Sequence, residues 1–152
     1  MNRFLLLLTF AFAICSGASA ASDATLDESR QLGYCEGVYI YAAQLLQIQN
    51  NSGAAVNALS RASRVVTANF FLNRQGDVIP GERLEEIKAA RRTVKPRLDS
   101  NPELVVSETT MCDKTTQPLI RRAMQKGGSL WGKNYVELNQ SLLTQYKKQL
   151  GL

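Results

Sequence analysis

The stretch YCEGVYIYAAQLLQIQNN, residues 34–51, is followed by Ser52-Gly53 and then by AAVNALSRASRVVTANFFL, residues 54–72. Apolar residues recur in both segments at steps of three and four, which is the period of an amphipathic helix. The Ser-Gly pair between them is typical of a turn. The sequence therefore predicts two helices, over about residues 26–50 and 54–73, that fold back on each other. We expect the rest of the chain to pack around this pair.

The remaining chain predicts further helices separated by Gly and Pro residues. They are expected over about residues 82–95, 102–116, 118–126 and 134–150. Pro96 and Pro118 should end or interrupt helices, because proline lacks the amide hydrogen that a helix needs. Gly127-Gly128 should stop the next-to-last segment, and residues 129–133 should form a loop. For 152 residues, this pattern predicts an all-α fold, a compact bundle of four to five helices in a single domain, residues 21–152.

Residues 1–20 have the features of a secretory signal peptide. Arg3 precedes the apolar segment FLLLLTFAFAIC, and small residues follow up to Ala20. We expect cleavage after Ala20, which removes one basic and no acidic residue and lowers the net charge from +5 to +4. The apolar segment is shorter than the roughly 20 residues that span a bilayer, and no longer one follows it. The sequence thus predicts a periplasmic or secreted protein with no transmembrane anchor after cleavage.

Two cysteines remain after this cleavage, Cys35 and Cys112. Exported proteins meet an oxidising compartment, in which two such thiols usually pair. We therefore expect a disulfide that joins the first helix to a later one. The alternatives are a redox-active pair, which no Cys-x-x-Cys spacing supports, and two free thiols.

The composition excludes several classes of functional site. The chain has no histidine, which removes Ser-His-Asp and Cys-His nucleophiles and His-ligated metals. No phosphate-binding glycine loop, dinucleotide fingerprint or EF-hand loop is present. The sequence therefore predicts a protein that is not an enzyme and has no metal and no cofactor. The basic residues lack the interleaved aromatic residues of single-strand binders, so no nucleic-acid partner is expected.

A carboxylate-based hydrolase is the alternative enzymatic interpretation. Glu36 and Asp113 each follow one of the two cysteines. If the disulfide forms, the two carboxylates come toward each other, and paired carboxylates can perform glycoside hydrolysis.

Two groups of residues are candidates for binding. The first is basic and would bind an anionic lipid or glycan through a helix face. Its members are Lys88, Arg91, Arg92, Lys95, Arg121 and Arg122. Acids precede bases along residues 82–95, so these charges also complement the helix dipole without any ligand. The second group is aromatic. Packing at the end of the bundle is the favoured interpretation of Trp131 and Phe71, and the alternative is that they are candidate interface residues.

The function expected first is that of a small exported helical protein without enzymatic activity. It would bind another envelope protein as an adaptor, inhibitor or chaperone-like factor. The absence of a catalytic constellation and a disulfide-stabilised scaffold that presents helix faces favour this expectation. Binding of an anionic envelope ligand through the basic residues is the second expectation, and the carboxylate hydrolase is the third.

Overall fold

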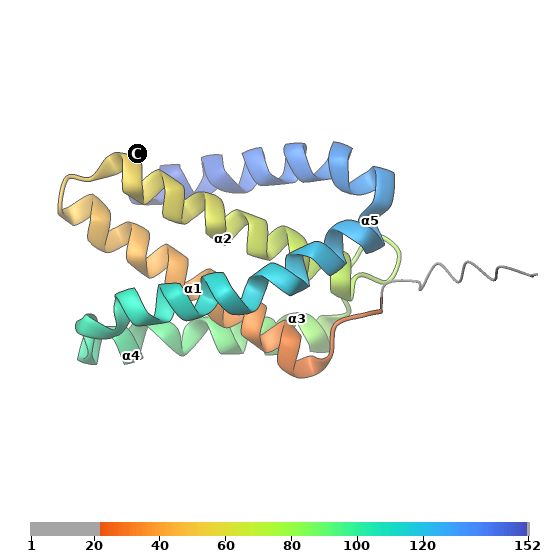
Figure 1. The fold of residues 1–152 in the computed structure, drawn as a ribbon, viewed down its shortest axis with the longest axis horizontal. Coiled ribbons are helices and arrows are strands. Elements are labelled where there is room, and N and C mark those ends of the chain that lie inside the picture. Colours follow the sequence, from red (N-terminus) through yellow and green to blue (C-terminus); the bar gives the residue numbers. More distant parts are fainter. Residues whose placement is uncertain (1–21, 152) are drawn as a thin grey trace, which may run out of the picture.

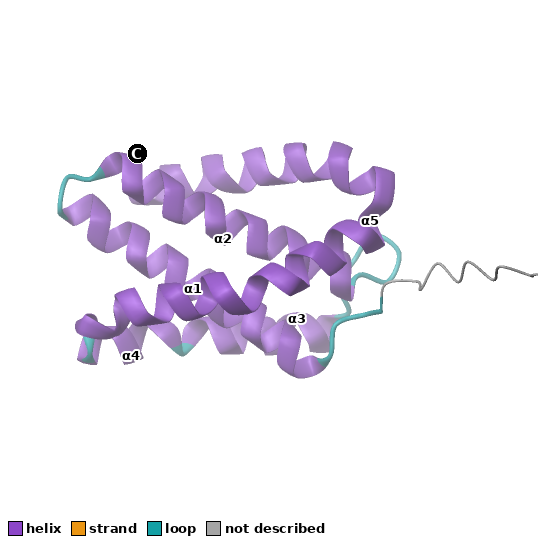
Figure 2. Cartoon of the chain, in the orientation of Figure 1, coloured by secondary structure: helices purple, strands orange, loops and turns teal. Residues whose placement is uncertain are grey.

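A computed structural model describes residues 22–151 of the chain. Over these residues the chain forms five α-helices and one short 3-10 helix, with no named strand. The elements are α1 (Leu26–Ile48), α2 (Ser52–Asn73), α3 (Gly81–Arg92), α4 (Val94–Ser100), η1 (Pro102–Leu104) and α5 (Val105–Leu150). Figure 2 shows how little of this part lies outside helices. The predicted all-α bundle is confirmed, whereas the predicted signal peptide, residues 1–20, lies outside the described residues.

Helices α1 and α2 form the expected antiparallel pair (Figure 1). A capping box begins α1: the Thr25 hydroxyl accepts from the Glu28 amide at 3.2 Å, and the Glu28 carboxylate accepts from the Thr25 amide at 2.8 Å. These bonds satisfy two amides that the first turn leaves free. In the turn, Asn50 has a φ of 58°, a left-handed conformation that asparagine tolerates. The Asn51 side chain then caps α2 by accepting from the Ala54 amide.

Helix α3 packs directly against the backbone of α1 at two glycines of α1, because these residues carry no side chain that would keep it away. A Cβ atom on Gly33 would lie 2.4 Å from the carbonyl oxygen of Ile87. A Cβ atom on Gly37 would lie 3.0 Å from the carbonyl oxygen of Arg91. The Cβ position of Gly37 also lies 2.9 Å from the Val94 side chain of α4. Both glycines flank Cys35 in sequence, but the helices that they admit are α3 and the start of α4, not the helix that carries the other cysteine.

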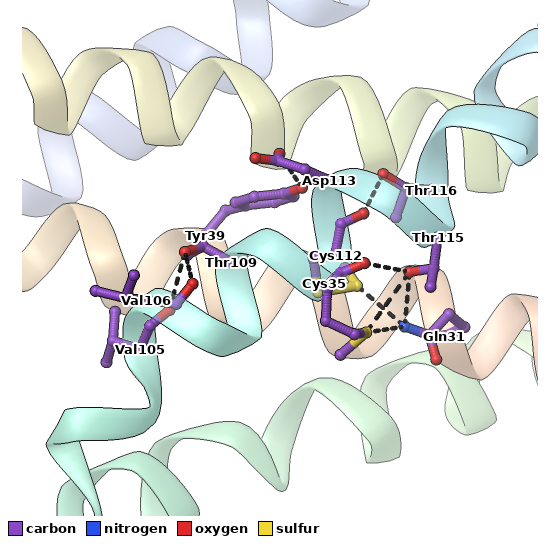
Figure 3. Close-up of a disulfide and its surroundings, with 11 residues drawn as sticks. Gln31, Cys35, Tyr39, Val105, Val106, Thr109, Cys112, Asp113, Thr115 and Thr116 are labelled. Carbon is purple, nitrogen blue, oxygen red and sulfur yellow. Dashed lines mark hydrogen bonds between the residues drawn. A yellow bond between two sulfur atoms is a disulfide. The ribbon is translucent and has the colours of Figure 1, made fainter.

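The predicted disulfide joins Cys35 of α1 to Cys112 of α5, with an S–S distance of 2.10 Å and a Cα–Cα distance of 5.4 Å. Both cysteines are fully buried. Figure 3 shows the Gln31 amide beside the sulfur atoms, where it donates to Cys35 Sγ at 3.2 Å. The largest fully buried side chains of the surrounding core are Leu32, Tyr39, Leu59, Phe71, Leu72 and Leu98.

The expected helix over residues 82–95 is divided in two. The break falls at Thr93, between α3 and α4. The interruption lies beside Arg92, whose carbonyl group a proline at position 96 cannot bond and crowds, so the predicted kink is present, and Pro96 itself lies in the first turn of α4. A missing amide hydrogen costs little there, because first-turn amides have no partner within the helix.

Helix α5 also differs from the expectation. It continues through the exposed residue Pro118, and residues 129–133 are helical where a loop was expected. Its sharp change of direction comes at Gly128, with φ 50° and ψ −131°, a conformation that glycine alone adopts easily. After this bend the second half of α5 runs back along α2 (Figure 1). None of the described helices combines the length and the apolar character needed to cross a membrane.

Candidate functional site

A groove of about 610 Å³ opens between α1, α2, α3, α4 and the second half of α5. Its volume is within the range of about 300–1,000 Å³ that is typical of small-molecule sites. Most of its walls are apolar: Ile40, Val66, Phe70, Ile79, Leu84, Ile87 and Val94. Its charged groups are a carboxylate from α1 and a set of cations from α3 and α4.

The carboxylate belongs to Glu36, which is only 6% exposed. Its Oε1 atom accepts from the Arg91 guanidinium at 2.7 Å and from the Tyr146 hydroxyl at 2.8 Å. Burial and the neighbouring carboxylate raise the pKa of the Tyr146 hydroxyl, so it remains a donor at neutral pH. A buried carboxylate needs such partners, since an unpaired buried charge is strongly destabilising. This cluster joins α1, α3 and the second half of α5.

Three cationic side chains line the groove: Lys88, Arg91 and Lys95. Lys88 lies 2.8 Å from Glu85, and Lys95 lies 2.6 Å from Asp99. These two lysine pairs are exposed, and an exposed pair contributes only about 0–1 kcal/mol. An ammonium group also has three donors. The lysines can therefore still bind a ligand anion while they keep their acidic neighbours.

The other predicted anion-binding residues do not share this surface. Arg92 is 3.9 Å from Glu85 and does not line the groove. Arg122 makes two hydrogen bonds to the Glu28 carboxylate, at 2.9 and 2.6 Å. That interaction lowers the pKa of Glu28 to about 2 and ties the start of α1 to α5. Arg121 is exposed elsewhere on α5. Three of the six predicted cations thus meet at the groove.

The two carboxylates expected for a hydrolase have separate partners. Asp113 accepts from the Tyr39 hydroxyl at 2.8 Å and from Arg61 at 2.7 Å. Figure 3 shows the Tyr39 ring pointing at Asp113 from α1. Burial, followed by the hydrogen bond to Asp113, raises the pKa of Tyr39. Glu36 and Asp113 therefore each bind a different tyrosine and a different arginine.

The two predicted interface residues are buried within the chain. Trp131 is 7% exposed and Phe71 is fully buried. Their ring centroids are 5.1 Å apart, and Phe71 also meets Phe70 edge to face. They pack at the bend of α5, which is the bundle-end arrangement that the sequence favoured over an exposed interface. As the chain is folded, neither ring is presented to a partner.

The sequence did not indicate the groove or the role of Tyr146. Tyr146 and Glu36 are 110 positions apart, and only the reversal of α5 brings them together. One signal was available, since Glu36 stands between Cys35 and Gly37 on the inward face of the first predicted helix. An acidic residue at such a position predicts a buried cationic or hydroxyl partner.

Comparison with models of known families, with curated proteins and with solved structures found no match. Among the described residues, no group of three acidic or cysteine side chains is arranged to hold a metal ion.

Proposed function

We propose that this is an exported protein without enzymatic activity that binds a single-chain anionic amphiphile in the groove. The alkyl chain would lie against the apolar walls, and the anionic head would lie beside Lys88 and Lys95. The observation that carries the proposal is the combination of apolar walls and lysines in one groove. Transfer of the alkyl chain from water would contribute about 0.8 kcal/mol for each buried CH₂ group.

The balance of charge in the groove favours an anion. Glu36 is the acidic residue among the groove residues, and Arg91 and Tyr146 already satisfy it. Lys88 and Lys95 have only exposed acidic neighbours outside the groove lining. A carboxylate or a phosphate head offers the same complementary chemistry, because both present several acceptor oxygens.

Export is part of the same proposal. The signal-peptide features of residues 1–20 and the disulfide between Cys35 and Cys112 support it. Disulfides persist in the periplasm and outside the cell and are rare in the cytosol.

The other two expected functions have less support from the geometry. For a protein partner, the predicted anchors Trp131 and Phe71 are buried. For a hydrolase, Glu36 and Asp113 bind different arginines instead of facing one another across a shared substrate. The groove therefore ranks first.

Calorimetric titration with decanoate, decyl phosphate and decyltrimethylammonium tests the proposal. We expect both anions to bind and the cation not to bind. Ile79→Glu places a carboxylate in the apolar wall and should weaken binding of the anions by at least about tenfold, which corresponds to about 1.4 kcal/mol. Val78→Glu is the matched control, because Val78 is 65% exposed and does not line the groove.

The lysines can be tested in the same titration. Lys88→Gln combined with Lys95→Gln should weaken both anions and reduce their sensitivity to salt. Arg92→Gln is the control, since Arg92 is on α3 but does not line the groove. Equal binding of the decyl cation, or anion binding that Ile79→Glu leaves unchanged, would contradict the proposal.

A further inference from the structure

The second half of α5, residues 129–150, is joined to the first half by a bend that depends on two glycines. Within α5 the residue with a non-helical backbone is Gly128, whose positive φ is unfavourable for any residue with a Cβ atom. A Cβ atom on Gly127 would lie 2.8 Å from the Cβ atom of Trp131 and 3.0 Å from the Phe71 ring. In a straight helix, Cβ atoms four residues apart are about 5–6 Å apart. The bend requires the positive φ of Gly128 and leaves no room for a Cβ atom on Gly127 beside Trp131, whereas a straight helix removes both of these constraints.

Contacts near both ends of the returning segment hold it on the bundle. Near the bend, the Trp131 ring packs on Phe71. Near the far end, the Tyr146 hydroxyl donates to Glu36 at 2.8 Å. Trp131 and Tyr146 are each only 7% exposed. If the segment left the bundle, Phe71 would lose this cover and Glu36 would lose one of its donors.

We propose that residues 129–150 exchange between two copies of the chain. In the exchanged form α5 is one straight helix, and its second half packs on the bundle of the other copy. The change of conformation is confined to the bend, because the rest of α5 is already helical. Exchange of an identical element re-forms every contact of the segment across the two copies. The Gly127-Gly128 pair permits the bend and so favours the single-chain form over the exchanged dimer.

A second copy is the partner that fits the uncovered surface. A straight α5 would project the 22 residues of the segment roughly 33 Å beyond the bend, at 1.5 Å per residue. Trp131 and Phe71 would then face water, which opposes a free projecting helix. An identical segment brings a tryptophan and a tyrosine with the spacing that matches Phe71 and Glu36 on the other bundle.

Exchange also makes the groove a shared site. Gln145, Tyr146 and Gln149 line the groove from the returning segment. In the exchanged dimer these three side chains come from the second copy, while α1 to α4 come from the first. The inference does not depend on what the groove binds.

The test is the oligomeric state and tryptophan emission of Gly128→Ala and Gly127→Ala, measured by size-exclusion chromatography with light scattering and by fluorescence. Trp131 is the single tryptophan of the chain, so its emission reports whether the segment is packed. We expect both variants to be dimers with the emission of the native, buried ring. Gly132→Ala is the matched control: nothing lies near its Cβ position, and it should remain a single chain.

Every other result would overturn the inference. A single chain with native emission would mean that the bend tolerates alanine. A single chain with red-shifted emission would mean that the segment detaches without a partner. A dimer with red-shifted emission would be held by some other surface. The exchanged dimer must also persist on dilution, because both segments have to unpack before the copies separate, and prompt dissociation would exclude exchange.

Discussion

Gly33 shows how a single missing side chain sets the distance between two helices. Its Cβ position is 2.4 Å from a backbone oxygen of α3, which can move only if the helix moves. We expect Gly33→Ala to lower the free energy of unfolding by about 1–3 kcal/mol, as overpacking of a core does. Urea unfolding followed by circular dichroism measures this change.

The control for this substitution is Gly53→Ala. Gly53 is in the first turn of α2, and no atom lies within 4 Å of its Cβ position. Alanine there should leave stability unchanged or raise it by up to about 1 kcal/mol through helix propensity. If Gly33→Ala were as stable as the native protein, α3 would not be fixed at the distance described.

At the scale of the elements, one ion pair fastens the start of α1 to α5. Arg122 holds the pKa of Glu28 at about 2 in the folded state, against an ordinary value of 4.5. The interactions of the Glu28 carboxylate with Arg122, and to a smaller extent with Thr25, should therefore stabilise the fold by about 2–3 kcal/mol at neutral pH. Because the folded-state pKa is lowered, this contribution is fully present above about pH 5 and is lost as the pH falls toward 2.

Glu28→Gln isolates this contribution, since glutamine also suits the capping box. We expect the variant to be less stable than the native protein at pH 7 and nearly equal to it near pH 2, as measured by urea unfolding across this range. Asp27→Asn is the control, because Asp27 is 94% exposed and lies 3.5 Å from Arg30. A stability difference that does not vary with pH would show that the ion pair is not its source.

The success of the sequence-based expectation also varied from element to element. Helices α1 and α2 could be predicted because their apolar period and the turn between them are local signals. The interruption expected at Pro118 is absent from the structure. Leu119 and Ile120, which directly follow it, pack in the core, and such packing keeps the helix intact. The groove could not be predicted from the sequence. Its Glu36 cluster includes Tyr146, which reaches Glu36 only after the bend in α5, and no local pattern specifies the direction of that bend.

At the scale of the whole molecule, the disulfide is the single covalent link between α1 and α5. It closes a separation of 77 positions. The chain-entropy model assigns such a loop about 4–5 kcal/mol of stabilisation. We expect Cys35→Ala combined with Cys112→Ala to lose most of this free energy of unfolding in urea titrations.

Reductant provides the control for the double variant, whose unfolding midpoint should not respond to dithiothreitol. The native protein should respond slowly, because both sulfur-bearing residues are fully buried. A double variant as stable as the native protein would mean that the unfolded chain is already compact enough for the link to add nothing.

The same separation of 77 positions has a consequence for folding during synthesis. Chains emerge from the ribosome amino end first, so Cys35 and the whole α1–α2 hairpin are made well before Cys112 exists. Any folding of this hairpin before Cys112 is available proceeds with Cys35 as a free thiol. The disulfide can therefore form only after α5 has been made and has packed on α1. A chain that stops before residue 112 keeps Cys35 as a thiol that can form mixed disulfides with other proteins.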